Sequence, residues 1–175
     1  MNRQDSFKND KNGLDAIDKK ILESLQKNGR LRNSELAREA GLAASSMLER
    51  VRRLEERGVI RGYRAVLDPR TLGFELEAIV LINLHRHQAG PAEEFEDRVR
   101  AVPEVMSCCH ITGRYDYMLH VAVRDIQHLG ELLKNTIGGI AGVEKQETFL
   151  VLSAIKNNDG YPLSSLPEAS GGTQV

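Results

Sequence analysis

Apolar residues recur with a helical period along the first third of the chain and predict two short helices there. Over residues 16–27, four apolar positions share one face, and Asp15 precedes them as an N-cap. A second helix of two turns is expected over 34–40, with Asn33 as its cap and Gly41 as its left-handed stop.

A third helix is expected from about Ser46 to the residue before Gly58. Its opening Ser46-x-x-Glu49 matches a capping box, so Ser46 is interpreted first as a cap and only second as a reader of bases. Apolar residues then occupy one side of this helix, and charged residues occupy the other.

The spacing between the second and third helices is typical of a helix-turn-helix. Ala37 is small, Gly41 follows four residues later, and the apolar Met47 follows six residues after that. The match is imperfect, because Arg50 occupies a position where an apolar residue is expected. The pattern leaves the outer face of the third helix available for a major groove.

The stretch 59–67 alternates between polar and apolar residues and predicts a short strand, a basic wing that carries Arg61 and Arg64. We therefore expect a winged helix-turn-helix domain, built from three helices plus short strands, over 14–66. A linker is expected over 67–74.

The remaining two thirds alternate between strand and helix patterns in the order β-α-β-β-α-β, which predicts a ferredoxin-like domain over 75–156. The fold class is therefore α+β. Residues 157–175, rich in Gly, Pro and Ser, are expected to form a flexible tail that could contact a neighbouring subunit. The expected strands are 75–87, 105–112, 117–124 and 143–156, and the expected helices are 91–101 and 126–137.

Both helices of this domain are expected on one side of the sheet, which leaves the other side open. An uncovered apolar sheet face is an association surface, so we expect a homodimer that assembles into higher oligomers. Candidates for this face come from three sets, of which the strand phase selects the members: Ile79 and Leu81, Met118 and Ala122, or Leu150 and Leu152.

Charge is distributed unevenly, although the net charge is only −1. Residues 27–64 hold 10 Lys and Arg against 5 Glu, which indicates nucleic acid as a partner of the first domain only. Together with the helix-turn-helix spacing, this predicts double-stranded DNA as the partner. The alternative is a solvated face on which glutamates pair with arginines along the helix. The candidate DNA-binding residues are Arg32, Ser45, Ser46, Glu49, Arg50, Arg52, Arg53, Arg61 and Arg64.

Composition excludes several other classes of protein. No apolar run is long enough to span a membrane, and the polar start is unlike a secretory signal, which indicates the cytoplasm. Cys108 and Cys109 are adjacent, cannot easily bridge each other and are expected to be packing residues. No cofactor or metal site is expected.

Several segments together resemble the Lrp/AsnC (leucine-responsive regulator/asparagine regulator) family of transcription factors over about residues 14–156. They read LDAIDKKILESLQKNGRLRNSELAREAGL, LERVRRLEERGVIRGYRAVLDP, CHITGRYDYMLHVAV and GVEKQETFLVLSAIK. The resemblance implies a DNA-binding module joined to a regulatory domain that forms oligomers and binds a small effector, commonly an amino acid. The effector residues that it implies are Thr112, Gly113, Arg114, Tyr115, Asp116 and Tyr117.

Alternative interpretations remain open at this stage. Gly113 and Asp116 could serve only to shape a hairpin. A decarboxylase that resembles the family would use histidines among His85, His87, His110, His120 and His128, but no nucleophile–base motif accompanies them, so we expect no enzyme. A metal sensor would use Cys108, Cys109 and His110, which alternate between the two faces of a strand. A ligand-free architectural DNA binder is the last alternative.

Overall fold

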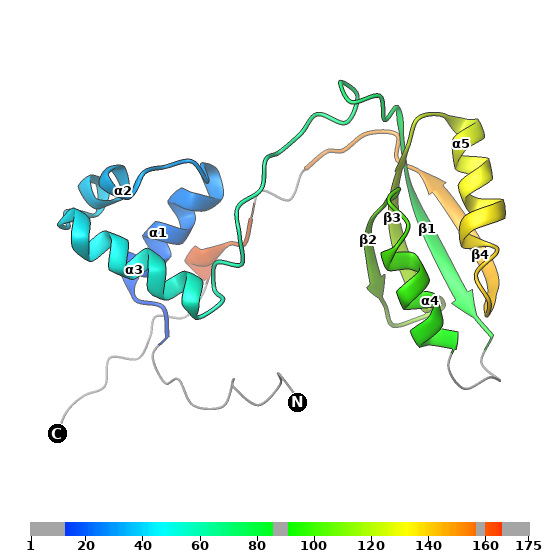
Figure 1. Cartoon of the computed structure of the whole chain (residues 1–175), viewed down its shortest axis with the longest axis horizontal. Helices are drawn as coiled ribbons and strands as arrows, with labels where there is room; N and C mark the ends of the chain where they lie inside the picture. Colours follow the sequence, from blue (N-terminus) through cyan, green and yellow to red (C-terminus); the bar gives the residue numbers. More distant parts are fainter. Residues whose placement is uncertain (1–12, 86–90, 157–159, 166–175) are drawn as a thin grey trace. The chain divides into compact units, whose positions relative to one another are not determined.

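The computed structural model describes residues 13–85, 91–156 and 160–165. Its described residues divide into two compact units, which are considered separately (Figure 1). The N-terminal unit contains residues 13–65 together with 160–165, and the C-terminal unit contains the described residues of 66–156. Among the described residues, no helix is both long and apolar enough to cross a membrane.

Three helices form the N-terminal unit: α1 (Ala16–Lys27), α2 (Asn33–Ala40) and α3 (Ala44–Glu56). The predicted span of α1 is confirmed, and the Asp15 carboxylate caps it by accepting from the Asp18 N–H at 2.7 Å. Gly41 ends α2 in the left-handed region with φ 66°, as predicted.

Two predicted helix starts were wrong. Asn33 already belongs to α2, and Arg32 is the capping residue, whose backbone N–H donates to the Glu35 carboxylate at 2.8 Å. α3 begins at Ala44 behind an extended Ala43 and has no side-chain cap. Ser46 therefore lies inside the first turn. The helix starts earlier because the Met47 N–H already donates to the Ala43 carbonyl at 3.0 Å, which closes the first turn without a side-chain cap.

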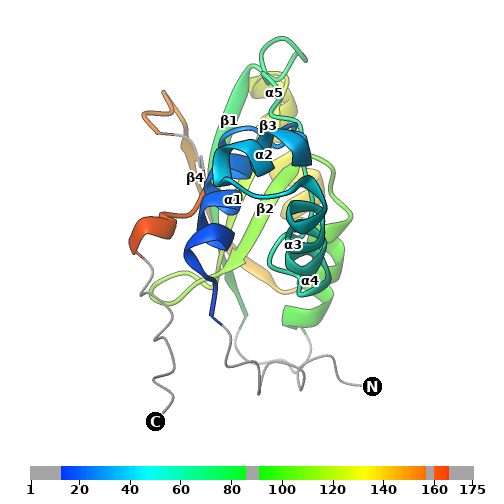
Figure 2. The same ribbon diagram turned by 90° about the vertical axis from the view of Figure 1, so that its left-hand side faces the viewer.

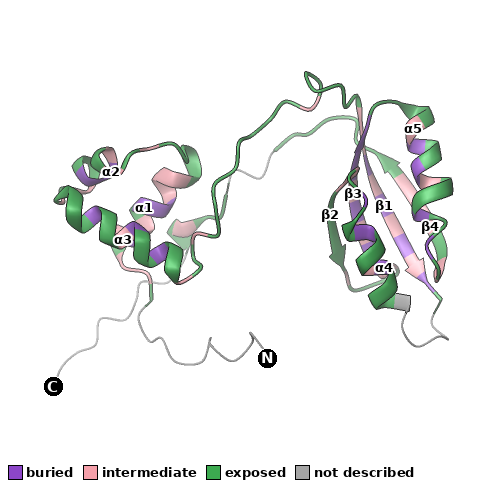
Figure 3. Cartoon of the chain, in the orientation of Figure 1, coloured by how far each residue is buried: buried purple, intermediate pink, exposed green. Residues whose placement is uncertain are grey.

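The core of this unit lies where the three helices meet, as the buried stripes along them show (Figure 3). Each helix contributes its apolar face, and residues from the chain around them add partly buried contacts. The fully or largely buried members are Ile21, Leu22, Leu36, Ala37, Met47, Val51 and Leu54.

The predicted wing strand over 59–67 does not form. Residues 61–68 have no regular secondary structure, and the side chain of Val66 is fully open to solvent at 99% exposure. An isolated strand has no stability without a neighbour to complete its hydrogen bonds, and the described part of this unit supplies none. The polar–apolar alternation over 59–67 therefore predicted a strand that has no neighbouring strand to pair with among the described residues of this unit.

The C-terminal unit is a four-stranded antiparallel sheet in the order β2-β3-β1-β4, which confirms the ferredoxin-like prediction. Its strands end earlier than the alternation predicted, because alternation continues past the last hydrogen-bonded pair. The elements are β1 (Leu76–Leu84), α4 (Pro91–Arg100), β2 (Val105–His110), β3 (Tyr117–Val123), α5 (Ile126–Glu131) continuing as a π-helix over Leu132–Ile137, and β4 (Val143–Leu150).

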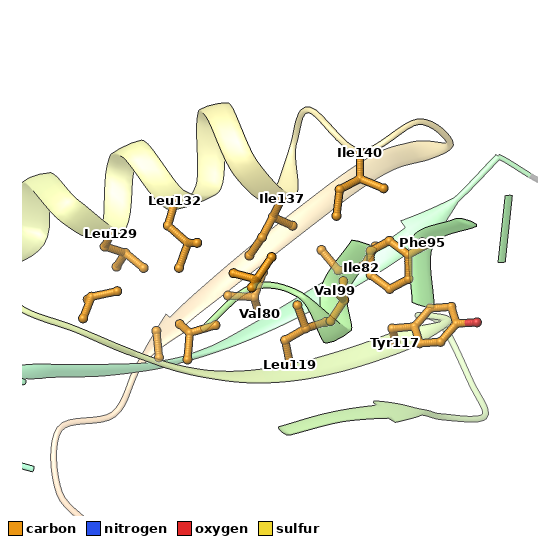
Figure 4. Close-up of a cluster of buried hydrophobic side chains, with 14 of the residues drawn as sticks. Val80, Ile82, Phe95, Val99, Tyr117, Leu119, Leu129, Leu132, Ile137 and Ile140 are labelled. Carbon is orange, nitrogen blue, oxygen red and sulfur yellow. The ribbon is translucent and has the colours of Figure 1, made fainter. Parts of the chain in front are cut away.

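One core joins both helices to the same face of the sheet (Figure 4). Val80 and Ile82 on β1 and Leu119 on β3 meet Phe95 from α4 and Leu132 from the π-helical turn, and all five are buried. The strand pairing fixes this arrangement, because a shift of one residue would turn the apolar set of each strand to the other face.

The opposite side of the sheet, here named the open sheet face, carries apolar side chains that neither helix covers. Ile79 pairs with Phe149 and Leu81 pairs with Met118, which gives an apolar patch across three strands. The polar His120 and Glu147 lie opposite Ile79 and Leu81 and interrupt this patch. Leu150 instead lies opposite Ala78 on the helix side, and Leu152 lies beyond β4, so these two candidates were wrong. The apolar members of the face are Ile79, Leu81, Met118, Ala122 and Phe149.

Candidate nucleic-acid interface and effector loop

The solvent-facing side of α3 is the first candidate site. Ser45, Ser46 and Glu49 are exposed on its first two turns, while Met47 and Val51 are buried beneath them. Because Ser46 caps nothing, its hydroxyl is available for contacts outside the helix. The N-terminal half of α3 therefore presents Ser45, Ser46 and Glu49, together with the exposed Leu48, on a helix anchored from behind.

A buried carboxylate anchors α3 to α1. Asp18 is only 2% exposed, and its two oxygens accept from Arg50 at 2.8 Å and from Arg53 at 3.4 Å. Arg50 also donates to Asp15 at 2.7 Å. Burial raises the pKa of Asp15, but the Asp18 N–H and the Arg50 guanidinium outweigh this effect, so the pKa lies below its ordinary value.

This cluster explains why Arg50 interrupts the apolar register of α3. Its side chain is 26% exposed and is committed to two carboxylates of α1, so an ion pair replaces the expected apolar contact. Sequence reasoning missed Asp18. Two features of the sequence could have revealed it. Arg50 occupies an apolar position of the third helix, and Asp18 lies next to the apolar positions of the first helix.

The other candidate arginines lie at the surface of the N-terminal unit. Arg52 is 64% exposed and pairs with Glu56 at 2.8 Å, a surface pair that costs little to break. Arg53 is half exposed and forms an ion pair with the Asp18 carboxylate at 3.4 Å. Arg32, at the start of α2, and Arg61 and Arg64, in the chain after α3, are all exposed.

The loop between β2 and β3 is the second candidate site. Gly113 adopts φ 121°, a conformation that side-chain-bearing residues rarely adopt. Asp116 closes the hairpin, because its carbonyl accepts from Ile111 at 2.9 Å and its N–H donates to Ile82 at 2.9 Å. Its carboxylate also accepts from the Leu84 N–H at 2.9 Å. Asp116 therefore has a structural role at the end of β1, whatever else it binds.

The tyrosines of this loop face different surroundings. The Tyr115 hydroxyl donates to Glu147 on β4, and the Arg114 guanidinium lies 5.4 Å from the Tyr115 ring centre. Tyr117 is buried at 3% exposure, and its hydroxyl donates to Glu96 at 3.0 Å. Burial and this hydrogen bond raise the pKa of Tyr117 to about 12.

The structure thus brings Thr112 to Asp116 together at one hairpin and places Tyr117 beneath them, in contact with the core. Thr112, Gly113 and Arg114 are exposed, whereas Tyr115 and Asp116 are half-buried. Sequence reasoning missed Glu147, because its contact with Tyr115 joins residues 32 positions apart. Only the strand order could have revealed it.

The sequence suggested that the two cysteines are packing residues, and this prediction was wrong. Cys108 and Cys109 are both exposed, because β2 is an edge strand with one neighbour. The β2–β3 pairing places Cys108 and His110 on the helix side and Cys109 on the open sheet face. Within residues 13–85, 91–156 and 160–165, no group of three His, Cys, Asp or Glu side chains is arranged to hold a metal ion.

Two family models match the chain in the same order as its two units. Residues 14–61 match a winged helix-turn-helix DNA-binding domain, and residues 77–161 match the Lrp/AsnC ligand binding domain. The chain is 40% identical over 146 residues to the leucine-responsive regulatory protein of Haemophilus influenzae, covering 83% of this chain and 88% of that protein. With the Escherichia coli K12 protein of the same name it shares 38% identity over 155 residues, covering 89% and 94%.

Solved structures agree with these matches. A transcriptional regulator from Neisseria meningitidis, crystallised as a complex with L-Met, superposes with a TM-score of 0.83 at 35% identity and covers 86% of this chain and 97% of its own. Escherichia coli AsnC superposes with a TM-score of 0.77 at 28% identity, covering 83% and 97%. With both domains matched in order and the fold shared along the chain, this protein belongs to the Lrp/AsnC family of transcriptional regulators.

Proposed function

We propose that the protein binds double-stranded DNA through the outer face of α3 and changes its DNA affinity or assembly when an amino-acid-like effector binds near the β2–β3 loop. The observation that supports this most is the anchoring of α3, whose outer polar face stays open while Asp18 and the core hold its inner face. The winged helix-turn-helix match over 14–61 supports the same partner.

The residues of α3 divide into different roles in this proposal. Ser45, Ser46 and Glu49 lie near the start of the helix, where side chains of a recognition helix reach base edges. Arg52 contacts a phosphate. Arg50 acts as a positioning residue, since its guanidinium is bound to Asp15 and Asp18.

The arginines outside α3 supply further phosphate contacts. Arg32 starts α2, the helix that crosses the backbone in this motif, and Arg61 and Arg64 follow α3 in an exposed segment. Such contacts set orientation and affinity without reading sequence, so their effect depends strongly on salt.

Replacing Arg52 with alanine is expected to weaken binding to every duplex and to reduce the slope of log affinity against log salt by about 1, because one phosphate contact is lost. A salt titration by fluorescence anisotropy measures this slope. Arg124→Ala is the matched control, an exposed arginine of the C-terminal unit. If the slope of Arg52→Ala equals that of the wild type, Arg52 does not contact DNA.

The effector site combines two kinds of group. Backbone amides around Gly113 suit a carboxylate, and the Asp116 carboxylate suits an α-ammonium group. One Asp116 oxygen accepts from Leu84, and the other accepts no hydrogen bond from the described residues. The Neisseria meningitidis relative was crystallised with L-Met, which makes amino acids the first ligands to test.

Asp116→Asn is expected to abolish most of the effector response and to leave DNA affinity without effector unchanged. Asparagine keeps an oxygen for the Leu84 N–H but loses the charge that binds an ammonium group. Thermal shifts with the twenty amino acids, followed by DNA binding with any hit, measure the response. Asp125→Asn is the control, since Asp125 caps α5 with a similar hydrogen bond. A full response in Asp116→Asn would place the ammonium site elsewhere.

A second subunit covers the open sheet face in this proposal. The face carries Ile79, Leu81, Met118 and Phe149 beside the polar His120 and Glu147, and an apolar group of this kind on an open sheet face is typical of an association surface. A dimer built on it is two-fold symmetric, so each subunit contributes the same residues. Two α3 helices of such a dimer then bind two nearby half-sites on DNA.

A further inference from the structure

The chain returns to the N-terminal unit after β4. Its last described helical turn, Leu163–Ser165, lies beside α1 in both views (Figures 1 and 2). The Gln26 side chain at the end of α1 holds this segment by both of its polar atoms. Its Nε2 donates to the Tyr161 carbonyl at 3.2 Å, and its Oε1 accepts from the Tyr161 N–H at 2.6 Å.

Three further features fit the segment to this surface. Gly160 adopts φ 118°, and a Cβ atom there would collide with the Gln26 side chain, so glycine permits both the backbone conformation and the close approach. Leu163 packs against the core cluster of the N-terminal unit. The Ser165 hydroxyl donates to the Pro162 carbonyl at 2.7 Å and closes the turn.

We propose that the surface of α1 around Gln26 is a docking site for residues 160–165 of the same chain, and that this docked segment is a second restraint between the two units. The chain passes from the N-terminal unit to the other unit after Ala65 and returns after Lys156. With the segment docked, the DNA-binding module is tied at two points instead of one, which reduces the conformations available to it.

The restraint acts on the element that positions α3. Gln26 lies on α1, the helix whose Asp18 binds Arg50 and Arg53 of α3. The docked segment therefore contacts the same helix whose buried Asp18 carboxylate holds α3. This inference stands on its own contacts and does not depend on DNA or effector binding.

Hydrogen exchange of the full-length chain tests the docking. Gln26→Ala removes both hydrogen bonds, and the Tyr161 amide is expected to exchange about tenfold faster while the amides within α1 stay protected. Lys27→Ala is the matched control, an exposed neighbour on the same helix. Gly160→Ala should reproduce the faster exchange without altering α1. Unchanged exchange in both variants would overturn the docking, and protection that depends on protein concentration would show a second copy as the occupant.

Distance distributions between spin labels test the restraint. Labels at Arg38→Cys on α2 and Gln127→Cys on α5, in a Cys108→Ser, Cys109→Ser background diluted with unlabelled chain, report the separation of the two units. Gln26→Ala is expected to broaden this distribution, and Lys27→Ala is expected to leave it unchanged. A distribution in Gln26→Ala equal to that of its parent would overturn the restraint, because the segment would then dock without limiting the units.

Discussion

Replacing Asp18 with alanine is expected to destabilise the N-terminal unit by about 2 kcal/mol, because the buried carboxylate accepts hydrogen bonds from two charged side chains. Asp18 is 2% exposed and binds Arg50 and Arg53 of α3. Arg50 retains Asp15 at 2.7 Å, which keeps the loss from being larger. Urea unfolding followed by circular dichroism measures the change.

Two further variants separate the ion pair from general effects on α1. Glu23→Ala removes a half-buried carboxylate from the same helix and is expected to change stability by less than about 1 kcal/mol. Asp18→Leu combined with Arg50→Met should recover much of the stability, because apolar side chains of similar size avoid burying charge. A full loss of stability with Glu23→Ala, or none with Asp18→Ala, would contradict the anchoring role.

The second large effect is expected on the open sheet face. Phe149 is 49% exposed on β4 and pairs with Ile79 across the strands. Phe149→Asp is expected to convert the proposed dimer to monomer at micromolar concentration, because losing an aromatic contact at an interface typically costs about 2 kcal/mol or more and a symmetric interface loses it twice. Analytical ultracentrifugation measures the shift.

A control distinguishes this interface from general solubility. Ile126 is an exposed apolar residue at the start of α5, outside the open sheet face, so Ile126→Asp should leave the dimer intact. A wild-type chain that sediments as a monomer at micromolar concentration would remove the proposed interface altogether. An unchanged dimer in Phe149→Asp would place the subunit contact on another surface.

The sequence predicted helices and strands well where the apolar residues of an element lie on one face and pack into a single core. The alternation over 75–87 predicted a strand, and the structure places the alternate residues Ala78, Val80 and Ile82 of β1 in the core. The span of α1 was also predictable, because its cap and its apolar face agree. Both results rest on local patterns that tertiary contacts reinforce.

Errors arose where a distant residue decides the outcome. The stretch 59–67 alternated as a strand does, but no described strand of its unit pairs with it. Arg50 broke a local pattern, and its partner Asp18 lies 32 residues away. Contacts over such separations leave no periodic signal in a single sequence.

The candidate sites could likewise be predicted where local patterns decide them, and could not be predicted where distant contacts decide them. The exposed polar face of α3 could be predicted, because helical period alone separates Ser46 and Glu49 from Val51. A structural role for Asp116 in the hairpin was one of the open interpretations, but its hydrogen bond with the Leu84 N–H could not be predicted, since Leu84 lies at the end of another strand. The docking of Tyr161 on Gln26 was equally hidden, because it joins residues 135 positions apart.

Selection of bound duplexes from a random library tests most directly whether α3 reads DNA sequence. The wild-type chain should enrich a defined motif. Ser46→Ala combined with Glu49→Gln should change the preferred bases within that motif, because hydroxyl and carboxylate groups select different base edges in the major groove. Arg124→Ala should return the wild-type motif. The same motif from the α3 variant, or no enriched motif from the wild type, would contradict recognition through this helix.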